Sequence, residues 1–275
     1  MTNLKKMAVI NDLSGSDRCS LTVAIPIITA MGIHCCSMPT AILSNHTGYD
    51  EYYFDDYTDK MPEFTKKWQG MNLHFDAIYT GFLGSEHQIQ IVEDFIQRFG
   101  EKGTNLIIDP VMGDNGRIYT TYTPVMCREM KKLVSTAHVV TPNVTEACQL
   151  ADVEYTGEEI DDSLAETLCR SIHNLGAESV VLTGVKHNGT ISNFVYEGDS
   201  MSKYSSSLLS TYFAGTGDVF SSIVAGMVCN GHSVARSVEF ATDYIYKVTK
   251  YSAECGFIWQ EGICIEKFMR DLIEI

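Results

Sequence analysis

Short apolar runs alternate with helix-forming segments along almost the whole chain, and this alternation constrains the fold more than any other feature. The expected strands cover residues 7–11, 33–40, 75–79, 105–109, 137–140 and 179–183. The expected helices cover residues 21–31, 86–99, 124–134, 164–175, 219–229, 234–251 and 265–275. Short apolar strands separated by helices are typical of a parallel sheet that helices cover on both faces. The sequence therefore predicts an α/β fold, a three-layer α/β/α sandwich with a mostly parallel central sheet.

Two stretches depart from this alternation. Residues 42–53 follow an expected strand and lead into an acidic, aromatic segment. We interpret them as a small flap over a site, with a plain surface excursion as the alternative. Residues 190–196 and 201–208 are expected to form a hairpin near the far edge of the sheet. No Pro/Ser-rich linker or internal repeat divides the 275 residues, so we expect a single domain over residues 1–275.

The chain is acidic, with 35 Asp and Glu residues against 20 Lys and Arg residues and a formal net charge of −15. This charge repels nucleic-acid phosphates and anionic membranes, so neither is an expected partner. The longest apolar stretch, residues 23–33, contains Pro26. It is also far shorter than the ~20 residues that span a bilayer. Nine cysteines without a CxxC motif indicate reduced thiols, and we expect a cytoplasmic protein.

The segment Phe213-Ala-Gly-Thr-Gly-Asp-Val-Phe220 is the strongest candidate for a functional site. Its glycines let backbone N–H groups turn toward a ligand, and the helix that follows adds positive potential at the same point. The alternative is a Gly-rich turn in which Asp218 caps the helix. A polyanion cradle beside a carboxylate suits phosphoryl transfer, because the donors stabilise the transferring group and the carboxylate accepts the proton of an attacking hydroxyl. The sequence contains no GxxxxGK[ST] P-loop.

Four motifs follow one another along the chain: Ser44-Asn-His-Thr-Gly-Tyr49, Asp109-Pro-Val-Met-Gly-Asp114, Thr141-Pro-Asn-Val-Thr-Glu146 and Gly215-Thr-Gly-Asp218. The last two resemble the TPNxxE segment and the anion-hole motif of the ribokinase superfamily. The second resembles the DPVxGD loop of pyridoxal and hydroxymethylpyrimidine kinases, and the first is similar to the flap of pyridoxal kinases. The chain thus resembles the pyridoxal kinases, which implies a ribokinase-like fold. The implied activity is phosphorylation of the 5′-hydroxymethyl group of a vitamin B6 vitamer by ATP, in pyridoxal 5′-phosphate salvage.

The resemblance also implies a role for each matching residue. Asp218 would be the catalytic base, and the amides of Gly215, Thr216 and Gly217 would form the anion hole. Asp109 and Glu146 would position Mg²⁺. The implied ATP-binding residues are Asp114, Asn143, Thr183 and Thr216, and the implied substrate-binding residues are Ser14, Thr47, Phe82 and Asp218. Each has a plainer alternative: Asp109 and Thr183 could simply end strands, and Glu146 could be a helix-start residue.

Two departures from the family pattern lie at the vitamer end of the predicted site. Phe82 stands where many pyridoxal kinases have a tyrosine, and the loop 12–18 lacks their GxxGN stretch. A hydroxymethylpyrimidine kinase of thiamine synthesis is therefore an alternative, and so is a catalytically silent B6-binding protein on the same fold. The resemblance further suggests a homodimer. The sequence leaves open which vitamer is preferred, whether a monovalent cation is needed, and how the chains assemble.

Overall fold

The main sheet, seen in a computed structural model that describes residues 4–275, has nine strands. These are β1 (Lys6–Ser14), β2 (His34–Leu43), β3 (Phe54–Asp56), β4 (Ala77–Thr80), β5 (Asn105–Ile108), β8 (Val139–Val140), β9 (Ser179–His187), β10 (Thr190–Glu197) and β11 (Ser200–Ser207). Their order is β11-β10-β9-β8-β5-β4-β1-β2-β3, and the pairs from β9 to β2 are all parallel. The predicted α/β class and mostly parallel sheet are confirmed. The short strands β6 (Gly113–Asp114) and β7 (Arg117–Ile118) pair separately.

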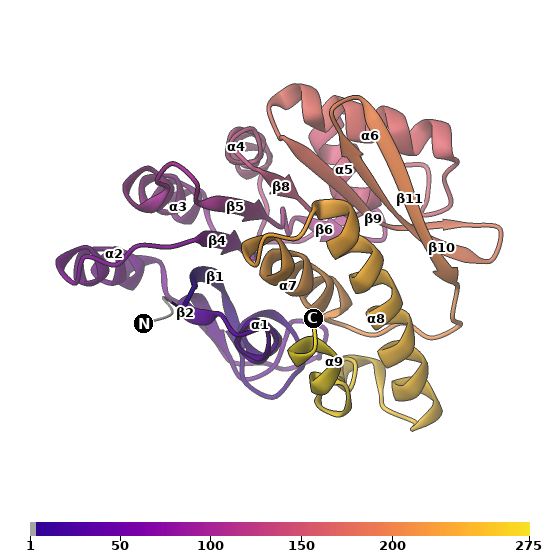
Figure 1. The fold of residues 1–275 in the computed structure, drawn as a ribbon, viewed down its shortest axis with the longest axis horizontal. Helices are drawn as coiled ribbons and strands as arrows, with labels where there is room; N and C mark the ends of the chain where they lie inside the picture. Colours follow the sequence, from indigo (N-terminus) through magenta and orange to yellow (C-terminus); the bar gives the residue numbers. More distant parts are fainter. Residues whose placement is uncertain (1–3) are drawn as a thin grey trace.

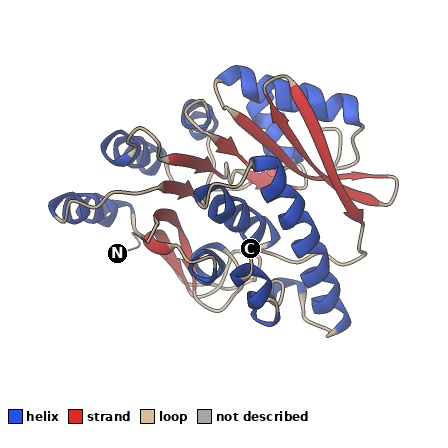
Figure 2. Ribbon diagram, viewed as in Figure 1, coloured by secondary structure: helices blue, strands red, loops and turns tan. Residues whose placement is uncertain are grey.

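Helices cover both faces of this sheet (Figures 1 and 2). They are α1 (Ser20–Ala30), α2 (Met61–Gly70), α3 (Glu86–Phe99), α4 (Pro124–Val134), α5 (Val144–Ala151), α6 (Asp162–Leu175), α7 (Thr216–Cys229), α8 (Val234–Glu254) and α9 (Met269–Ile273). In Figure 1, α1, α7 and α8 lie on one face, and α3, α4, α5 and α6 lie on the other. This is the predicted three-layer sandwich. None of the helices formed by residues 4–275 has the length and apolar character that crossing a membrane requires.

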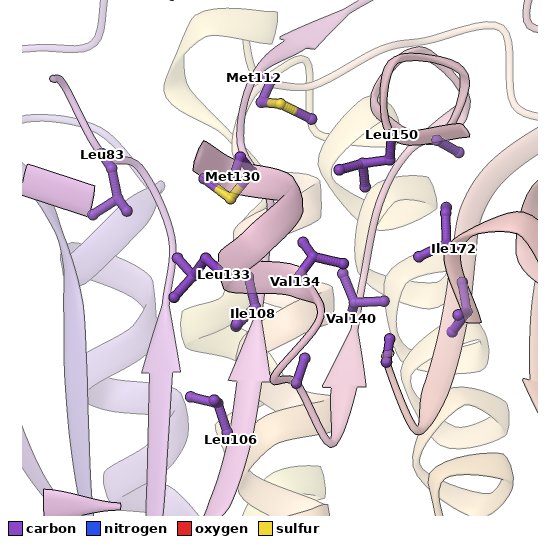
Figure 3. Packing of buried hydrophobic residues seen from close by; sticks show 14 of the residues in the cluster. Leu83, Leu106, Ile108, Met112, Met130, Leu133, Val134, Val140, Leu150 and Ile172 are labelled. Atoms are coloured by element: carbon purple, nitrogen blue, oxygen red, sulfur yellow. The ribbon is translucent and has the colours of Figure 1, made fainter. Parts of the chain in front are cut away.

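Successive side chains of the central strands point to opposite faces of the sheet and belong to two separate hydrophobic cores. Leu106 and Ile108 of β5 pack on the α4 side, against residues that include Leu133 and Val134 (Figure 3). Ile107, between them in sequence, belongs to the core on the α1 and α7 side. This two-residue period explains why the central strands read as unbroken apolar runs, since both faces of the sheet are buried.

The C-terminal end differs from its prediction. Residues 265–275 were expected to form one helix, but the 3₁₀ turn Ile265–Lys267 and the short α9 are separated by Phe268. The ring of Phe268 packs edge-on against Tyr251 of α8, with ring centroids 5.3 Å apart. Its backbone leaves the helical region at φ −119° and ψ 10°. Packing on α8 thus interrupts a helical pattern at this point.

The predicted flap is the connection between β2 and β3. β2 continues to Leu43 and β3 pairs with it in antiparallel orientation, so the loop spans residues 44–53. The predicted hairpin is confirmed as β10 and β11, which pair antiparallel. The sequence interpretation missed β3, which lies within the acidic, aromatic segment 50–57, and α2, which follows that segment.

Candidate active site

The carboxyl ends of the parallel strands meet at one edge of the sheet, which is where open α/β sheets bind their ligands. β1, β4, β5 and β8 form the middle of the sheet, so the residues that follow them gather at this edge. A hydrogen bond between Asn11 of β1 and Asp218 brings the first turn of α7 to the same place. Three of the four sequence motifs therefore converge around the N-terminus of α7.

Gly215 and Gly217 shape the start of α7 in different ways. Gly215 is the N-cap, with φ +73°, and a Cβ atom there would lie 2.1 Å from the carbonyl oxygen of Arg18. Only glycine fits that position. A Cβ on Gly217 would meet no atom within 4 Å, so the backbone here is open to a ligand. The first N–H groups of the helix, which include that of Thr216, have no intrahelical partner and can bind an anion.

Asp218 is the third residue of α7, and the N-cap is Gly215, so the simple capping alternative does not hold. Its Oδ1 atom accepts a hydrogen bond from Nδ2 of Asn11 at 3.2 Å. Burial, followed by the negative charge of Asp12, raises the pKa of Asp218 to about 6. A carboxylate whose pKa lies near neutrality is well suited to accept a proton during catalysis.

Asp109 and Glu146 are two further carboxylates at this edge, and they are only 7% and 3% exposed. Burial, and then the charge of Asp218, raises the pKa of Asp109 to about 7. Burial, and then the charge of Asp109, raises the pKa of Glu146 well above its usual range. Repulsion therefore links the three acids in a chain, from Asp218 through Asp109 to Glu146. A cation bound between them would relieve that repulsion.

Mg²⁺ fits these residues. Within residues 4–275, no group of three or more His, Cys, Asp or Glu side chains could hold a metal ion. Mg²⁺ does not need such a group, because it keeps several waters and binds through one or two carboxylates and substrate phosphates. Glu146 also has the structural role that was its alternative. It completes a capping box with Asn143 at the start of α5, and its two oxygens accept the N–H groups of Met112 and Asn143 at 3.1 and 2.9 Å.

Three of the four predicted ATP-binding residues, Asp114, Asn143 and Thr183, lie in neighbouring segments, and the fourth, Thr216, begins α7. Asn143 and Thr183 form a parallel β-bridge, which joins the start of α5 to β9. The Asn143 amide donates to the carbonyl oxygen of Gly113 at 2.8 Å, which ties in the β6 strand that carries Asp114. The hydroxyl of Tyr212 donates to Asp114 at 3.3 Å. The structure brings these residues together, and their contact with ATP stays a prediction.

The predicted substrate-binding residues are placed less uniformly. The N–H of Phe82 donates to Oδ1 of Asn11 at 2.8 Å, so this residue lies within the site. Ser14 is fully buried, and its hydroxyl donates to the carboxylate of Asp12 at 2.9 Å. Thr47 is exposed on the flap. The ring-binding role of these side chains stays a prediction.

The flap is held by residues from distant parts of the chain. Asp17 is buried, and its carboxylate accepts the N–H of His46 at 2.7 Å and the hydroxyl of Tyr49 at 3.2 Å. The Nε2 atom of His46 lies 2.9 Å from the carbonyl oxygen of Gln260. These contacts close residues 44–49 over the loop that follows β1.

Sequence reasoning missed three polar residues of the site: Asn11, Asp12 and Asp17. All three are buried, and Asn11 is fully so. The available signal was the change from an apolar strand to Asn-Asp at its carboxyl end, where ligands bind. Within the loop 12–18, only Ser14 was assigned a role, and the loop otherwise attracted notice because it departs from a family pattern.

Comparison with known proteins agrees with the resemblance to pyridoxal and hydroxymethylpyrimidine kinases. The phosphomethylpyrimidine kinase family model matches residues 24–261. The pyridoxine kinase of Bacillus subtilis is 30% identical over 184 residues, which are 64% of this chain and 65% of that enzyme. A Bacteroides thetaiotaomicron protein provisionally named a phosphomethylpyrimidine kinase, in a crystal form with pyridoxal, is 39% identical. It superposes with a TM-score of 0.92 over 98% of this chain and 96% of that one. The pyridoxal kinase of Lactobacillus plantarum is 25% identical, with a TM-score of 0.91 over 99% and 98% of the two chains.

These matches differ in how much of each relative they cover. The chain spans between 46% and 65% of the length of the first curated relatives that it matches. The family match, in contrast, extends over most of this chain and includes the loops that carry Asp109, Glu146 and Asp218. The ribokinase-like fold, the converging acids and the open, glycine-rich start of α7 all agree with that match, and the chain belongs to the phosphomethylpyrimidine kinase family.

Proposed function

We propose that this protein transfers the γ-phosphoryl group of ATP to the 5′-hydroxymethyl group of a vitamin B6 vitamer. The observation that carries this proposal is the position of Asp218. Its carboxylate lies in the first turn of α7, next to the open backbone of Gly217 and with a pKa raised to about 6. A base placed beside an anion cradle is what transfer to a hydroxyl group requires.

In this proposal, different residues of the chain accept the proton, stabilise the transferring group and hold Mg²⁺. Asp218 accepts the hydroxyl proton as the oxygen attacks phosphorus, and the N–H groups of Gly215, Thr216 and Gly217 stabilise the charge on the transferring group. Asp109 and Glu146 would hold Mg²⁺, which neutralises charge on the phosphate oxygens when it is bound. ADP is the leaving product.

Two features favour a B6 vitamer as the substrate. The flap sequence Ser44–Tyr49 resembles that of pyridoxal kinases, and it lies over the β1 loop through Asp17. The 39%-identical Bacteroides protein is described in a crystal form with pyridoxal. Hydroxymethylpyrimidine is the second candidate, favoured by Phe82 in place of a tyrosine and by the name of the matching family. A homodimer, as in the resembling family, is proposed with either substrate.

An ATP-consumption assay with pyridoxal, pyridoxine, pyridoxamine and hydroxymethylpyrimidine tests the proposal. We expect Mg²⁺-dependent turnover of at least one B6 vitamer, and loss of that turnover in an Asp218→Asn control. Turnover of hydroxymethylpyrimidine alone would replace the proposal with the second candidate. Vitamer binding without turnover would support a silent B6-binding protein.

A further inference from the structure

Asn11 is fully buried at the carboxyl end of β1, and all of its side-chain contacts lie in the site. Its Oδ1 atom accepts two backbone N–H groups, that of Asp12 at 2.9 Å and that of Phe82 at 2.8 Å. Its Nδ2 atom donates to Oδ1 of Asp218 at 3.2 Å. Because both N–H groups point at one atom, only one orientation of the amide satisfies them. The NH₂ group must therefore face Asp218.

The space for this side chain is provided by Gly81. A Cβ atom on Gly81 would lie 2.4 Å from Nδ2 and 2.5 Å from Cγ of Asn11. Gly81 is not among the glycines with positive φ, so its backbone does not require glycine. The absence of a side chain at Gly81 leaves room for the amide of Asn11.

We propose that Asn11 is a positioning residue that orients the Asp218 carboxylate for proton transfer. An amide NH₂ group can only donate, so it selects the ionised carboxylate, which can only accept. With Oδ1 held by the Asn11 amide, Oδ2 is the oxygen assigned to the substrate hydroxyl. In the transfer step the hydroxyl O–H bond breaks and its proton goes to Oδ2, the new O–P bond forms, and the bond to the β-phosphate oxygen of ATP breaks. The inference rests on the proposed role of Asp218 as the base.

The most direct test is Asn11→Asp, which keeps the acceptor for both backbone N–H groups and removes only the donor. Two carboxylates would then face each other, and one of them must take up a proton. The introduced carboxylate would keep its charge because two N–H groups bind it, so Asp218 would carry the proton and be lost as a base. We expect kcat to fall at least about a hundredfold, since loss of a general base costs ~10²–10⁴-fold. We expect KM for ATP and for the vitamer to change less than about threefold.

Asn230→Asp is the matched control. Asn230 follows the opposite end of α7, and its Nδ2 atom donates to the carbonyl oxygen of Met31 at 3.0 Å. The control therefore loses the same kind of donor away from the site, and its kcat should stay at the parent value. Gly81→Ala gives a second route to the same effect, because it displaces Asn11 without changing any donor. It should reproduce the kcat loss, with KM for ATP little changed.

One combined variant, Asn11→Asp with Asp218→Asn, separates positioning from a general structural role through two readouts. In an Asp218→Asn background, Asn11→Asp should cost little further activity, because Asn11 acts only through the carboxylate that is already missing. The same double variant exchanges the two side chains, so it again places a donor opposite an acceptor. It should therefore melt at a higher temperature than Asn11→Asp alone while staying inactive. A parental kcat in Asn11→Asp, or full additivity of the two losses, would overturn the inference. A parent protein inactive on all four substrates would overturn the proposed function instead, and the melting temperatures would still test the contact.

Discussion

The candidate site has a phosphate half, around Asp109, Glu146 and Asp218, and a flap half, around residues 44–53. The two halves differ in how their residues are held. In the phosphate half, Glu146 is 3% exposed, and backbone N–H groups bind both of its carboxylate oxygens. In the flap half, Thr47 is exposed, and the loop around it is fixed through Asp17 and Gln260, which lie far away in sequence. The first half is fixed by a capping box and by backbone N–H groups at strand ends, and the second by a few side-chain hydrogen bonds between loops.

This contrast separates chemistry from selectivity. The groups that handle phosphate need fixed positions, because stabilisation of a transition state depends on donors placed in advance. The flap can change its contacts at low cost, since loops over a rigid scaffold tolerate variation. We therefore expect substitutions in the phosphate half to change kcat and substitutions in the flap half to change the KM for the vitamer.

The largest expected effect comes from Asp218→Asn in the phosphate half. Asparagine is nearly isosteric, and its oxygen can still accept the Asn11 amide, but it cannot take up a proton. We expect kcat to fall at least about a hundredfold, the lower range for loss of a general base. Steady-state kinetics measure kcat, and calorimetric titration with a non-hydrolysable ATP analogue measures nucleotide affinity.

Nucleotide affinity is the control for Asp218→Asn, and it should stay near the parent value. A kcat within about threefold of the parent would contradict the assignment of the base. A parallel loss of nucleotide affinity would show that Asp218 organises the loop around Gly215 instead.

The flap half is tested by Asp17→Ala, which removes the acceptor for the His46 N–H and the Tyr49 hydroxyl. A hydrogen bond to a charged group contributes about 1.5–3 kcal/mol. We expect the KM for the vitamer to rise about tenfold with the KM for ATP unchanged, since ~1.4 kcal/mol corresponds to that factor. Asp50→Ala, which removes an exposed carboxylate from the same flap, is the control. Equal rises in both KM values would show that the two halves are not separable.

A smaller effect is expected from Glu146→Gln. The substitution removes a negative charge near Asp109, so the Mg²⁺ concentration for half-maximal rate should rise several-fold. It also places an amide NH₂ group against a backbone N–H, either that of Met112 or that of Asn143. Loss of one buried hydrogen bond costs ~1–3 kcal/mol, so the melting temperature should fall as well. A lower melting temperature with an unchanged Mg²⁺ dependence would leave Glu146 only its role as a helix-start residue.

The smallest effect is expected from the thiols. Cys19 lies between the two halves, in van der Waals proximity to Gly215, but burial raises the pKa of its thiol above the usual range. A protonated thiol is a poor nucleophile, so Cys19 should not react in a short assay. Cys255, in contrast, is exposed. Activity should be the same with and without reductant in a short assay, even after Cys255 is alkylated. Rapid inactivation that reductant reverses would point to Cys19.

The sequence predicts the fold well and locates the loops assigned to the phosphate half, because both depend on local patterns. The central strands are apolar on both faces, and the motifs around Asp109, Asn143 and Gly215 each lie on one strand-to-helix connection. The break at Phe268 could not be predicted, since it depends on packing against Tyr251 of α8. Here a tertiary contact outweighs helical periodicity.

The contacts that complete the site are long-range and escape sequence analysis. Asn11 and Asp218 are 207 residues apart, and His46 and Gln260 are 214 residues apart. Their meeting depends on the strand order, which places β1 next to β4. It also depends on Gly81, whose missing side chain makes room for Asn11. Neither condition appears as a motif.

The strand order also governs when activity can arise during synthesis on the ribosome. β1 precedes the other strands of the sheet in the chain and is the third strand from the β3 edge, and its Asn11 amide cannot meet Asp218 until that residue has been translated. The contact between His46 of the flap and Gln260 can form only after Gln260 has been translated. Since domains generally fold as units, a nascent chain that stops before these residues carries the early strands without a working site. The complete set of site contacts can therefore form only after Gln260 has been translated, and with the proposed activity a product truncated before Asp218 should consume no ATP.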